Sequence, residues 1–379
     1  MARIAFFAFD IAEASQIRRI QSIRSLGHDV VSLSFRRNNM NREFQPDWPN
    51  LDLGTTRNKS YFRRLVQIGF GLVRAIRARS MLGDSKVWIA RNLDLMIIAV
   101  ALKVLTRRRE VKIVYECLDI HDLLTRSDAI GRAVRTAERG LLAHTDLLIV
   151  SSPAFVRAYF RPLQGYDGPV SVIENKLWLG LAPLPRPTAP RRRAKPEPLV
   201  LGWVGSLRCR PSLDILAGAA QALGPKLQVV IHGNVHRNAL PDFDAVIAGH
   251  PNMRYFGPYR YPDDLHAIYT SCDLVWAQDL WQRGGNSDWL LPNRIYEASY
   301  FGCPSIALVN TETGRRVIDA RLGYTVAEPT ADALVALLAN IDGDAISATA
   351  QRLLAAPADE FRLLPDEVSA ALAPVLEEQ

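Results

Sequence analysis

Short apolar runs that alternate with helical segments most constrain the fold of this 379-residue chain. The first run, ARIAFFAF at 2–9, is typical of a buried strand, and the helical segment SQIRRIQSIRSLG separates it from the next run, HDVVSLSF. Strand-length runs joined by helices predict βαβ units and a parallel sheet. Further strands are expected at 86–90, 111–116, 146–151, 198–206, 227–233, 252–257, 273–278 and 303–309.

A proline-rich segment, residues 179–198, interrupts this alternation. Proline removes a backbone donor and fixes φ, so a regular helix or central strand is excluded there and an extended linker is expected. The alternation restarts after it. We therefore predict an N-terminal α/β domain at 1–178, a second α/β domain at 199–355, and a C-terminal helix within 356–379 that could pack back on the first domain.

Charge is distributed unevenly along the chain, although the net charge is only +7. Residues 1–198 hold 33 Lys and Arg against 18 Asp and Glu, whereas the remainder holds 13 against 21. The basic half predicts an anionic partner such as nucleic acid, an acidic membrane surface or a phosphorylated substrate. Nucleic acid is not expected, because the basic runs lack interleaved aromatic residues and no nucleic-acid module is recognised.

Cysteine usage and hydropathy exclude several classes of protein. The four cysteines are far apart and form no CxxC pair, which argues against a zinc site or a disulfide framework and suggests a reducing compartment. Asp10 interrupts the apolar start too early for a secretory signal. The apolar run 95–102 ends at Lys103 and is far shorter than the roughly 20 residues of a membrane span. A cytoplasmic protein is expected.

Ligands of parallel α/β sheets bind beyond the carboxyl ends of the strands, so the loops there are candidate sites. The first is GWVGSLRCRPSL at 202–213. Gly205 would let a ligand approach the backbone closely, and Arg208 and Arg210 offer guanidinium groups that match phosphate oxygens. The alternative is a plain turn with two solvated arginines.

The second candidate lies in WQRGGNSDWLLPNRIYEASYFGCP at 281–304. Arg283 to Asn286 form a glycine-containing loop that is expected to be flexible, and Asn293 and Arg294 lead into a helix whose positive end suits phosphate. Glu297, one turn further, could accept both hydroxyls of a ribose. The alternative is an exposed helix face with Glu297 in water.

The sequence LPNRIYEA, followed by FGCPSIA, resembles the nucleotide-binding helix of GT-B glycosyltransferases, family four in particular. The resemblance covers most of the chain and implies two Rossmann-like domains facing a cleft. It implies that Glu297 binds the ribose, that Arg208 and Arg210 bind the diphosphate, and that no metal is required. The family's first glutamate is replaced by Trp289, with Asp288 beside it. The nucleotide-sugar site is expected to comprise Gly205, Arg208, Arg210, Asn286, Asn293, Arg294 and Glu297.

The third candidate, VYECLDIHDL at 114–123, holds four groups that could handle protons: Glu116, Asp119, His121 and Asp122. It resembles an acceptor-domain loop of the same family, which implies that His121 contacts the donor sugar and that Asp119 orients it or acts as a base. The alternative is that Asp119 or Asp122 caps the following helix while His121 is a satisfied surface residue.

The first loop, FDIAEASQIRR at 9–19, lacks the glycines that the family usually has there. Asp10, Glu13 and Ser15 stand in their place. Asp10 and Glu13 are candidates for facing the hydroxyls of an acceptor, and Ser15 for capping a helix.

Residues 57–79 carry seven basic side chains and no acidic one, with apolar residues at helical spacing. This pattern predicts either a basic amphipathic helix on an anionic bilayer or a helix that packs its apolar stripe on the sheet. Two further basic runs, 107–109 and 191–193, add positive surface.

These expectations combine into a nucleotide-sugar-dependent glycosyltransferase, with a UDP-sugar as the preferred donor. The acceptor is expected to be a saccharide, lipid-linked, at the inner face of the plasma membrane, in exopolysaccharide, capsule or lipopolysaccharide assembly. The resemblance favours retention of configuration. The alternatives are an inverting enzyme with Asp119, Asp10 or Glu13 as base, a sugar-nucleotide epimerase, and a non-catalytic scaffold of an assembly complex.

Overall fold

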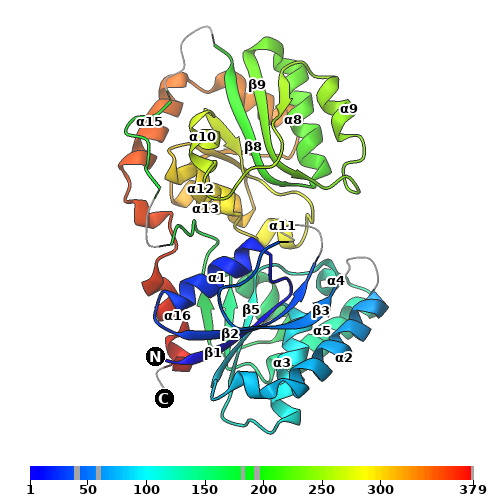
Figure 1. The fold of residues 1–379 in the computed structure, drawn as a ribbon. Helices are drawn as coiled ribbons and strands as arrows, with labels where there is room; N and C mark the ends of the chain where they lie inside the picture. Colours follow the sequence, from blue (N-terminus) through cyan, green and yellow to red (C-terminus); the bar gives the residue numbers. More distant parts are fainter. Residues whose placement is uncertain (38–42, 57–60, 181–183, 192–196, 377–379) are drawn as a thin grey trace. The chain divides into compact units, whose positions relative to one another are not determined.

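The computed structural model describes residues 1–37, 43–56, 61–180, 184–191 and 197–376, and it divides into two compact units. Unit 1 comprises Met1–Glu174 together with Leu364–Gln379, and unit 2 comprises Asn175–Leu363. Each unit is a parallel α/β sheet with helices on its faces (Figure 1). The predicted α/β fold class is therefore confirmed.

Unit 1 contains a seven-stranded sheet in the order β3-β2-β1-β4-β5-β6-β7, with every neighbouring pair parallel. The chain first builds outward from β1 and then continues on its other side with β4, which is the doubly wound arrangement. Strand β1 is central, and Ile4 to Ala8 are fully buried because helices cover both faces of the sheet. The strands are β1 Arg3–Ala8, β2 Asp29–Arg36, β3 Asn50–Thr55, β4 Val87–Arg91, β5 Lys112–Cys117, β6 Leu147–Val150 and β7 Val170–Val172.

Helices of unit 1 begin where side chains satisfy their first backbone N–H groups. Glu13 caps α1 by accepting from the Gln16 N–H, and Asp128 caps α5 by accepting from the Gly131 N–H. The helices are α1 Ala14–Arg24, α2 Tyr61–Arg77, α3 Leu93–Leu105, α4 Asp122–Thr125, α5 Ala129–Leu142, α6 Pro153–Phe155, α7 Arg161–Gln164 and α16 Pro365–Leu376.

The C-terminal helix α16 belongs to unit 1, although it follows unit 2 in the sequence. It packs against α1, β6 and β7, and the Ser171 hydroxyl donates a hydrogen bond to the Ala371 carbonyl at 2.9 Å. Figure 1 shows this red helix beside the blue α1. The helix expected within 356–379 is thus present at 365–376, preceded by a short 3-10 turn at 358–360.

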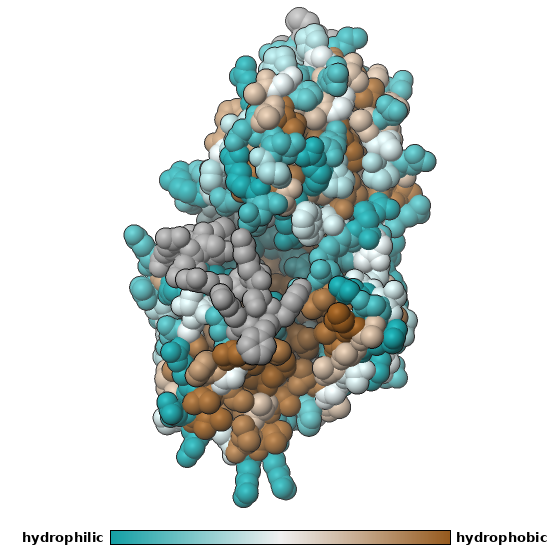
Figure 2. All heavy atoms as spheres, turned by 90° about the vertical axis from the view of Figure 1, so that its right-hand side faces the viewer, coloured by the Kyte–Doolittle hydropathy of each residue, from teal (hydrophilic) through white to brown (hydrophobic). Residues whose placement is uncertain are grey.

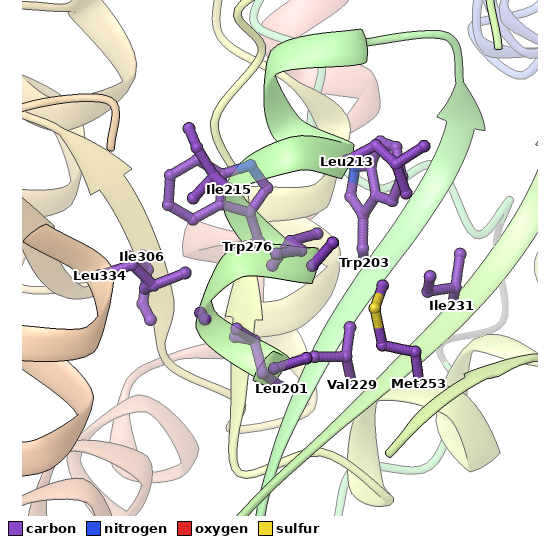
Figure 3. Close-up of a cluster of buried hydrophobic side chains, with 14 of the residues drawn as sticks. Leu201, Trp203, Leu213, Ile215, Val229, Ile231, Met253, Trp276, Ile306 and Leu334 are labelled. Atoms are coloured by element: carbon purple, nitrogen blue, oxygen red, sulfur yellow. The ribbon is translucent and has the colours of Figure 1, made fainter. Parts of the chain in front are cut away.

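Unit 2 contains a six-stranded parallel sheet in the order β10-β9-β8-β11-β12-β13. Two large indoles, Trp203 on β8 and Trp276 on β11, lie beneath α8 in its core (Figure 3), and the Trp276 N–H donates to the Ser212 hydroxyl at 3.1 Å. The strands are β8 Leu199–Leu207, β9 Leu227–Val235, β10 Met253–Tyr255, β11 Leu274–Trp276, β12 Ser305–Leu308 and β13 Gly323–Val326.

The helices of unit 2 cover both faces of this sheet (Figure 1). They are α8 Arg210–Leu223, α9 Phe243–Ala248, α10 Leu265–Thr270, α11 Asn286–Trp289, α12 Asn293–Tyr300, α13 Glu312–Asp319, α14 Ala331–Asn340 and α15 Gly343–Ala355. No single helix in the described residues is long and apolar enough to cross a membrane. Helices α14 and α15 reach that length and composition only as a pair, and they are bent by 92° to each other.

The described part of the proline-rich segment, 184–191, forms neither helix nor strand and is fastened along unit 2. Arg186 donates hydrogen bonds to the carbonyl groups of Tyr300, Leu353 and Ala356 at 2.6–2.8 Å, and its guanidinium lies over the Tyr300 ring. Arg191 pairs with the buried Asp273 at 2.5 Å. These contacts hold the segment in place even though proline excludes regular hydrogen bonding.

A buried ion network joins the carboxyl ends of β4 and β5 to α1. Glu116 is fully buried and accepts from Arg19 Nε at 2.6 Å and Arg91 Nε at 2.8 Å. Burial alone would raise the pKa of Glu116, but the two guanidinium groups outweigh it and lower that pKa. Arg91 also donates to the Ser15 hydroxyl, which donates to Glu13. The sequence made Glu116 a candidate for proton transfer. In the structure its carboxylate is the counter-charge of two buried arginines, which is a structural role.

Replacing Glu116 by glutamine should destabilise unit 1 by about 3–5 kcal/mol, because it leaves two buried guanidinium groups without their counter-charge. Urea unfolding followed by far-UV circular dichroism would measure this loss. Glu110→Gln, at an exposed position of the same unit, is the matched control and should change stability by no more than about 0.5 kcal/mol. A loss below about 1 kcal/mol for Glu116→Gln would contradict the structural role of the network.

Candidate functional site

The strand order of unit 2 reverses between β8 and β11, and this topological switch point positions the candidate site. The loops that follow these two strands lead away in opposite directions from neighbouring carboxyl ends, which leaves room for a ligand at that edge. The loop after β8 carries Arg208, and the loop after β11 carries Asp279. Both sequence segments that were expected to bind a nucleotide therefore meet at one edge of the sheet.

Two glycines remove side chains from the carboxyl ends of β8 and β9. Gly205 and Gly233 are paired in the sheet and have φ angles of +118° and +140°. A Cβ at Gly233 would lie 1.7 Å from the Gly205 carbonyl oxygen, so only glycine fits there. A Cβ at Gly205 would lie 3.6 Å from Arg294 Nη2. The Arg294 guanidinium of α12 therefore reaches the end of β8.

Arg208 is half-exposed and lies 4.0 Å from the Asp279 carboxylate, measured from Nη2 to Oδ2. His236 is close by, with Nε2 2.8 Å from the Ser206 hydroxyl oxygen. Burial and then the positive charge of Arg208 lower the pKa of His236, so this imidazole is neutral at neutral pH. Because Asp279 is 4.0 Å away and His236 is neutral, the positive charge of Arg208, three residues after Gly205, is only weakly compensated.

Arg210 differs from Arg208 in its surroundings. Its guanidinium lies 2.8 Å from Asp214 of its own helix and 2.5 Å from Asp242. Two carboxylates of the protein already occupy the fork that a diphosphate would need. The structure gives Arg210 a local role at the start of α8, and its expected contact with a nucleotide stays a prediction.

Glu297 lies inside α12 and is only 5% exposed, so the alternative of a carboxylate in open water is wrong. The hydroxyl group of Tyr269, from α10, donates to Glu297 Oε2 at 2.8 Å. Burial and the Glu297 charge both raise the pKa of Tyr269, which stays protonated and remains a donor. Asn293 and Arg294 precede Glu297 in the first turn of the same helix.

The loop after β11 is closed by its own hydrogen bonds, in contrast to the flexible loop expected from its glycines. The Gln282 N–H donates to the Ser287 hydroxyl at 2.7 Å, and that hydroxyl donates to Asp279 Oδ1 at 3.2 Å. Asp288 accepts from the Gly284 N–H at 2.8 Å and pairs with Arg283 at 3.1 Å. Asn286 is buried at the start of α11. Asp288 therefore serves the loop itself.

In unit 1, His121 caps α4 with its own ring. Its Nδ1 lies 3.2 Å from the Leu123 N–H nitrogen and 2.5 Å from Asp122 Oδ1. The same Leu123 N–H also donates to Asp122 Oδ1 at 2.9 Å, so the predicted alternative of a cap from Asp122 is confirmed in part, with His121 sharing that donor. The side chains of Asp119, His121 and Asp122 are all exposed at the carboxyl end of β5.

Asp10 and Glu13 follow β1 and are engaged with the backbone around them. Asp10 is buried and accepts from the N–H groups of Ala12 and Arg37 at 3.1 and 3.3 Å. Burial raises the pKa of Asp10, although these backbone donors lower it in part. Glu13, rather than Ser15, caps α1. Both carboxylates thus accept hydrogen bonds from backbone N–H groups that could otherwise bind a phosphate group.

Several residues of the candidate site were missed in the sequence. Asp279 and Trp281 lie in the loop that follows β11, and the position of a loop after a parallel strand marks its residues as candidates for a site. Tyr269 and His236 lie on other elements and are brought to the site only by tertiary packing. Within the described residues, no group of His, Cys, Asp or Glu is arranged to hold a metal ion, and the four cysteines are buried and unpaired.

Comparison with known proteins gives one curated relative and many similar structures. The succinoglycan biosynthesis protein ExoL of Rhizobium meliloti strain 1021 is 34% identical over 355 residues, which are 93% of this chain and 88% of ExoL. Sucrose-phosphate synthase of Thermosynechococcus elongatus superposes with a TM-score of 0.72 at 16% identity, covering 100% of this chain and 97% of that one. Anabaena HepE, solved with UDP and glucose, gives 0.70 at 14% identity over 99% of each chain. No family model matches.

Two parallel doubly wound units of this kind form the GT-B class of fold, as the resemblance in the sequence implied. Within that class, the chain belongs to the family of the succinoglycan biosynthesis protein ExoL.

Proposed function

We propose that unit 2 binds a UDP-sugar and that the enzyme transfers the sugar to a growing exopolysaccharide. The observation that carries this proposal is that Arg294 reaches Gly205 at the switch point. Arg208 lies on the loop that follows the same strand, and the buried Glu297 lies one turn further along the helix of Arg294. The names of the similar proteins agree with it, since HepE was solved with UDP and glucose and ExoL takes part in succinoglycan biosynthesis.

Each residue has a role that follows from its chemistry. The Glu297 carboxylate accepts the two ribose hydroxyls, while Tyr269 fixes its orientation. Arg208 and Arg294 neutralise the diphosphate as it leaves, so we propose that no metal ion is needed for that step. Gly205, Asn286 and Asn293 line the same donor site. Arg210 is left out because its charge is already taken by Asp214 and Asp242.

For the acceptor we propose a lipid-linked saccharide that binds to unit 1. Asp119 and His121 are exposed at the carboxyl end of β5 and can contact hydroxyl groups. Asp10 and Glu13 bring negative charge to the loop after β1, which suits hydroxyl donors better than phosphate. We propose a retaining reaction, in which the leaving phosphate helps to deprotonate the acceptor hydroxyl on the same face of the sugar.

Helix α2 supports the membrane part of this proposal because it is apolar on two sides. Ile68, Gly71 and Ala75 are buried in unit 1, so the predicted packing stripe exists. A second set of large apolar side chains on α2 faces outward, and Figure 2 shows apolar residues gathered over this part of unit 1. The outward set is Leu65, Val66, Phe70 and Val73.

Two exposed arginines of α2 lie beside its outward face. The helix carries no acidic residue, and Arg74 and Arg77 are exposed beside the apolar set. Helix α3 packs along α2 and ends in the exposed Val104 and Leu105, just before the basic run 107–109. Apolar side chains with a basic border fit an anionic bilayer, where each arginine near the surface contributes roughly 1 kcal/mol. Residues 57–60 of the predicted basic helix lie outside the described residues.

Nucleotide binding should depend on Glu297 and Arg208 but not on Arg210. Calorimetric titration of the full chain with UDP and with GDP should show one preferred nucleotide, expected to be UDP. Glu297→Ala or Glu297→Gln should weaken its binding at least tenfold, because hydrogen bonds to a charged group contribute about 1.5–3 kcal/mol. Arg208→Ala should weaken it similarly, whereas the matched Arg210→Ala should not. If the wild-type chain binds neither nucleotide at millimolar concentration, a non-catalytic scaffold replaces this proposal.

Transfer should retain the anomeric configuration of the donor. Incubation with UDP-glucose and UDP-galactose, with and without a membrane extract as the acceptor source, followed by NMR of the anomeric proton, would measure this. An α-linked product from these α-linked donors is the expected result. A β-linked product would instead require a carboxylate base such as Asp119, and interconversion of the two donors without extract would identify an epimerase.

Vesicle binding should depend on the outward face of α2. Wild-type protein should co-sediment at low salt with vesicles that contain anionic lipid, and less at high salt because ions screen the arginines. The double variant Leu65→Ser with Phe70→Ser should bind several-fold more weakly. Ile130→Ser on α5 is the matched control, since Ile130 is also exposed on a unit 1 helix. Unchanged sedimentation of the double variant, or none for the wild type, would contradict the proposal.

A further inference from the structure

Trp281 is an exposed indole at the edge of unit 2 where the donor site lies. In the described part of this unit, the large apolar side chains that are exposed are Phe256, Trp281 and Ile318. Phe256 is covered on one face by His232, whose ring stacks on it at 4.8 Å, and Ile318 lies near the end of α13. Trp281 is 43% exposed, and no aromatic ring of the described residues stacks on it.

The backbone that presents Trp281 is held firmly. The Trp281 N–H donates to Asp279 Oδ1 at 2.7 Å, and the next residue, Gln282, donates its N–H to the Ser287 hydroxyl. Ser287 in turn donates to the same Asp279 oxygen. The exposed part of the indole remains in water, which costs hydrophobic free energy. A ligand that covers the ring would recover that free energy.

Asp279 also connects Trp281 to the proposed phosphate site. One carboxylate oxygen of Asp279 accepts from the Trp281 backbone, while the other lies 4.0 Å from Arg208 Nη2. The Trp281 backbone and the Arg208 guanidinium therefore approach the same carboxylate from its two oxygens. In a nucleotide-sugar the hexose is bonded directly to the terminal phosphate, so a sugar whose phosphate meets Arg208 has its ring close to this loop.

The chemistry of a pyranose ring matches this position. A hexose has polar hydroxyl edges and faces made of C–H groups, and these C–H faces pack against the negatively charged face of an aromatic ring. Asp279, whose carboxylate accepts from the Trp281 backbone, can also accept a hydroxyl hydrogen bond from the sugar edge. A tryptophan beside a carboxylate thus offers both kinds of contact that a hexose needs.

We propose that Trp281 is the stacking surface for the hexose of the donor and that it distinguishes nucleotide-sugar from free nucleotide. This inference rests on the proposed function of unit 2 as the donor site. It assigns nucleotide recognition to Arg208, Arg294 and Glu297, and sugar recognition to Trp281. Losing the indole therefore weakens binding of the sugar-bearing ligand only.

The test compares two dissociation constants in the full chain, one for UDP and one for the UDP-hexose that the wild type binds best among UDP-glucose and UDP-galactose. Trp281→Ala should leave the UDP constant within about twofold and weaken UDP-hexose binding about tenfold. Trp281→Phe keeps an aromatic face and should restore most of the loss. Ile318→Ala, which removes an exposed apolar side chain elsewhere on unit 2, should leave the ratio of the two constants unchanged.

The outcomes separate this inference from the proposed function. If Trp281→Ala binds UDP-hexose as well as the wild type, or loses UDP and UDP-hexose equally, the stacking role is overturned while the donor site stands. If the wild type binds UDP but neither UDP-glucose nor UDP-galactose, the stacking role is also overturned. If the wild type binds none of these ligands, the proposed function fails and this inference fails with it.

Discussion

The reversal of strand order beside the first strand of each sheet is the constraint on which both candidate sites depend. In unit 2 it separates the loops after β8 and β11, and in unit 1 it separates the loops after β1 and β4. Parallel strands bring all these loops to one edge of their sheet. The two units nevertheless use that edge differently. Unit 2 keeps Arg208 and Arg294 beside bare glycine backbone, whereas unit 1 uses Arg19 and Arg91 to neutralise a buried glutamate.

This difference decides which ligand each edge can accept. A diphosphate needs positive charge that is not fully compensated, and Arg208 of unit 2 has its carboxylate partner at 4.0 Å, beyond hydrogen-bond distance. At the corresponding edge of unit 1, Asp10 and Glu13 accept the backbone N–H groups of the first loop. A phosphate placed there would meet two carboxylates instead of free donors. Hydroxyl groups can donate to those carboxylates, which favours a saccharide on unit 1 and a nucleotide on unit 2.

The sequence predicted the interior of both sheets better than their edges. The central strands are continuous apolar runs because helices cover both of their faces, and these were located to within a few residues. The strands β3, β7 and β13 were missed, and each is an edge strand with half-exposed residues that leave no apolar run to detect. At the site, Glu297 could be found because a short motif carries it. Tyr269 could not, because the hydrogen bond that makes it relevant joins two helices far apart in the sequence.

Net charge along the chain does not coincide with the nucleotide site that we propose. The basic first half suggested an anionic partner there, yet the diphosphate site that we propose lies in the half with an excess of acidic residues. Several acidic groups near the site form ion pairs with arginines of the same unit. Asp214 and Asp242 pair with Arg210, and Asp288 pairs with Arg283. Arg208 lies 4.0 Å from the Asp279 carboxylate, so its positive charge is less compensated than that of Arg210. The excess of arginines in unit 1 is instead spread over surfaces such as the border of α2. Many weak contacts with an extended anionic layer add up on such a surface, whereas one small ligand would contact few of the arginines.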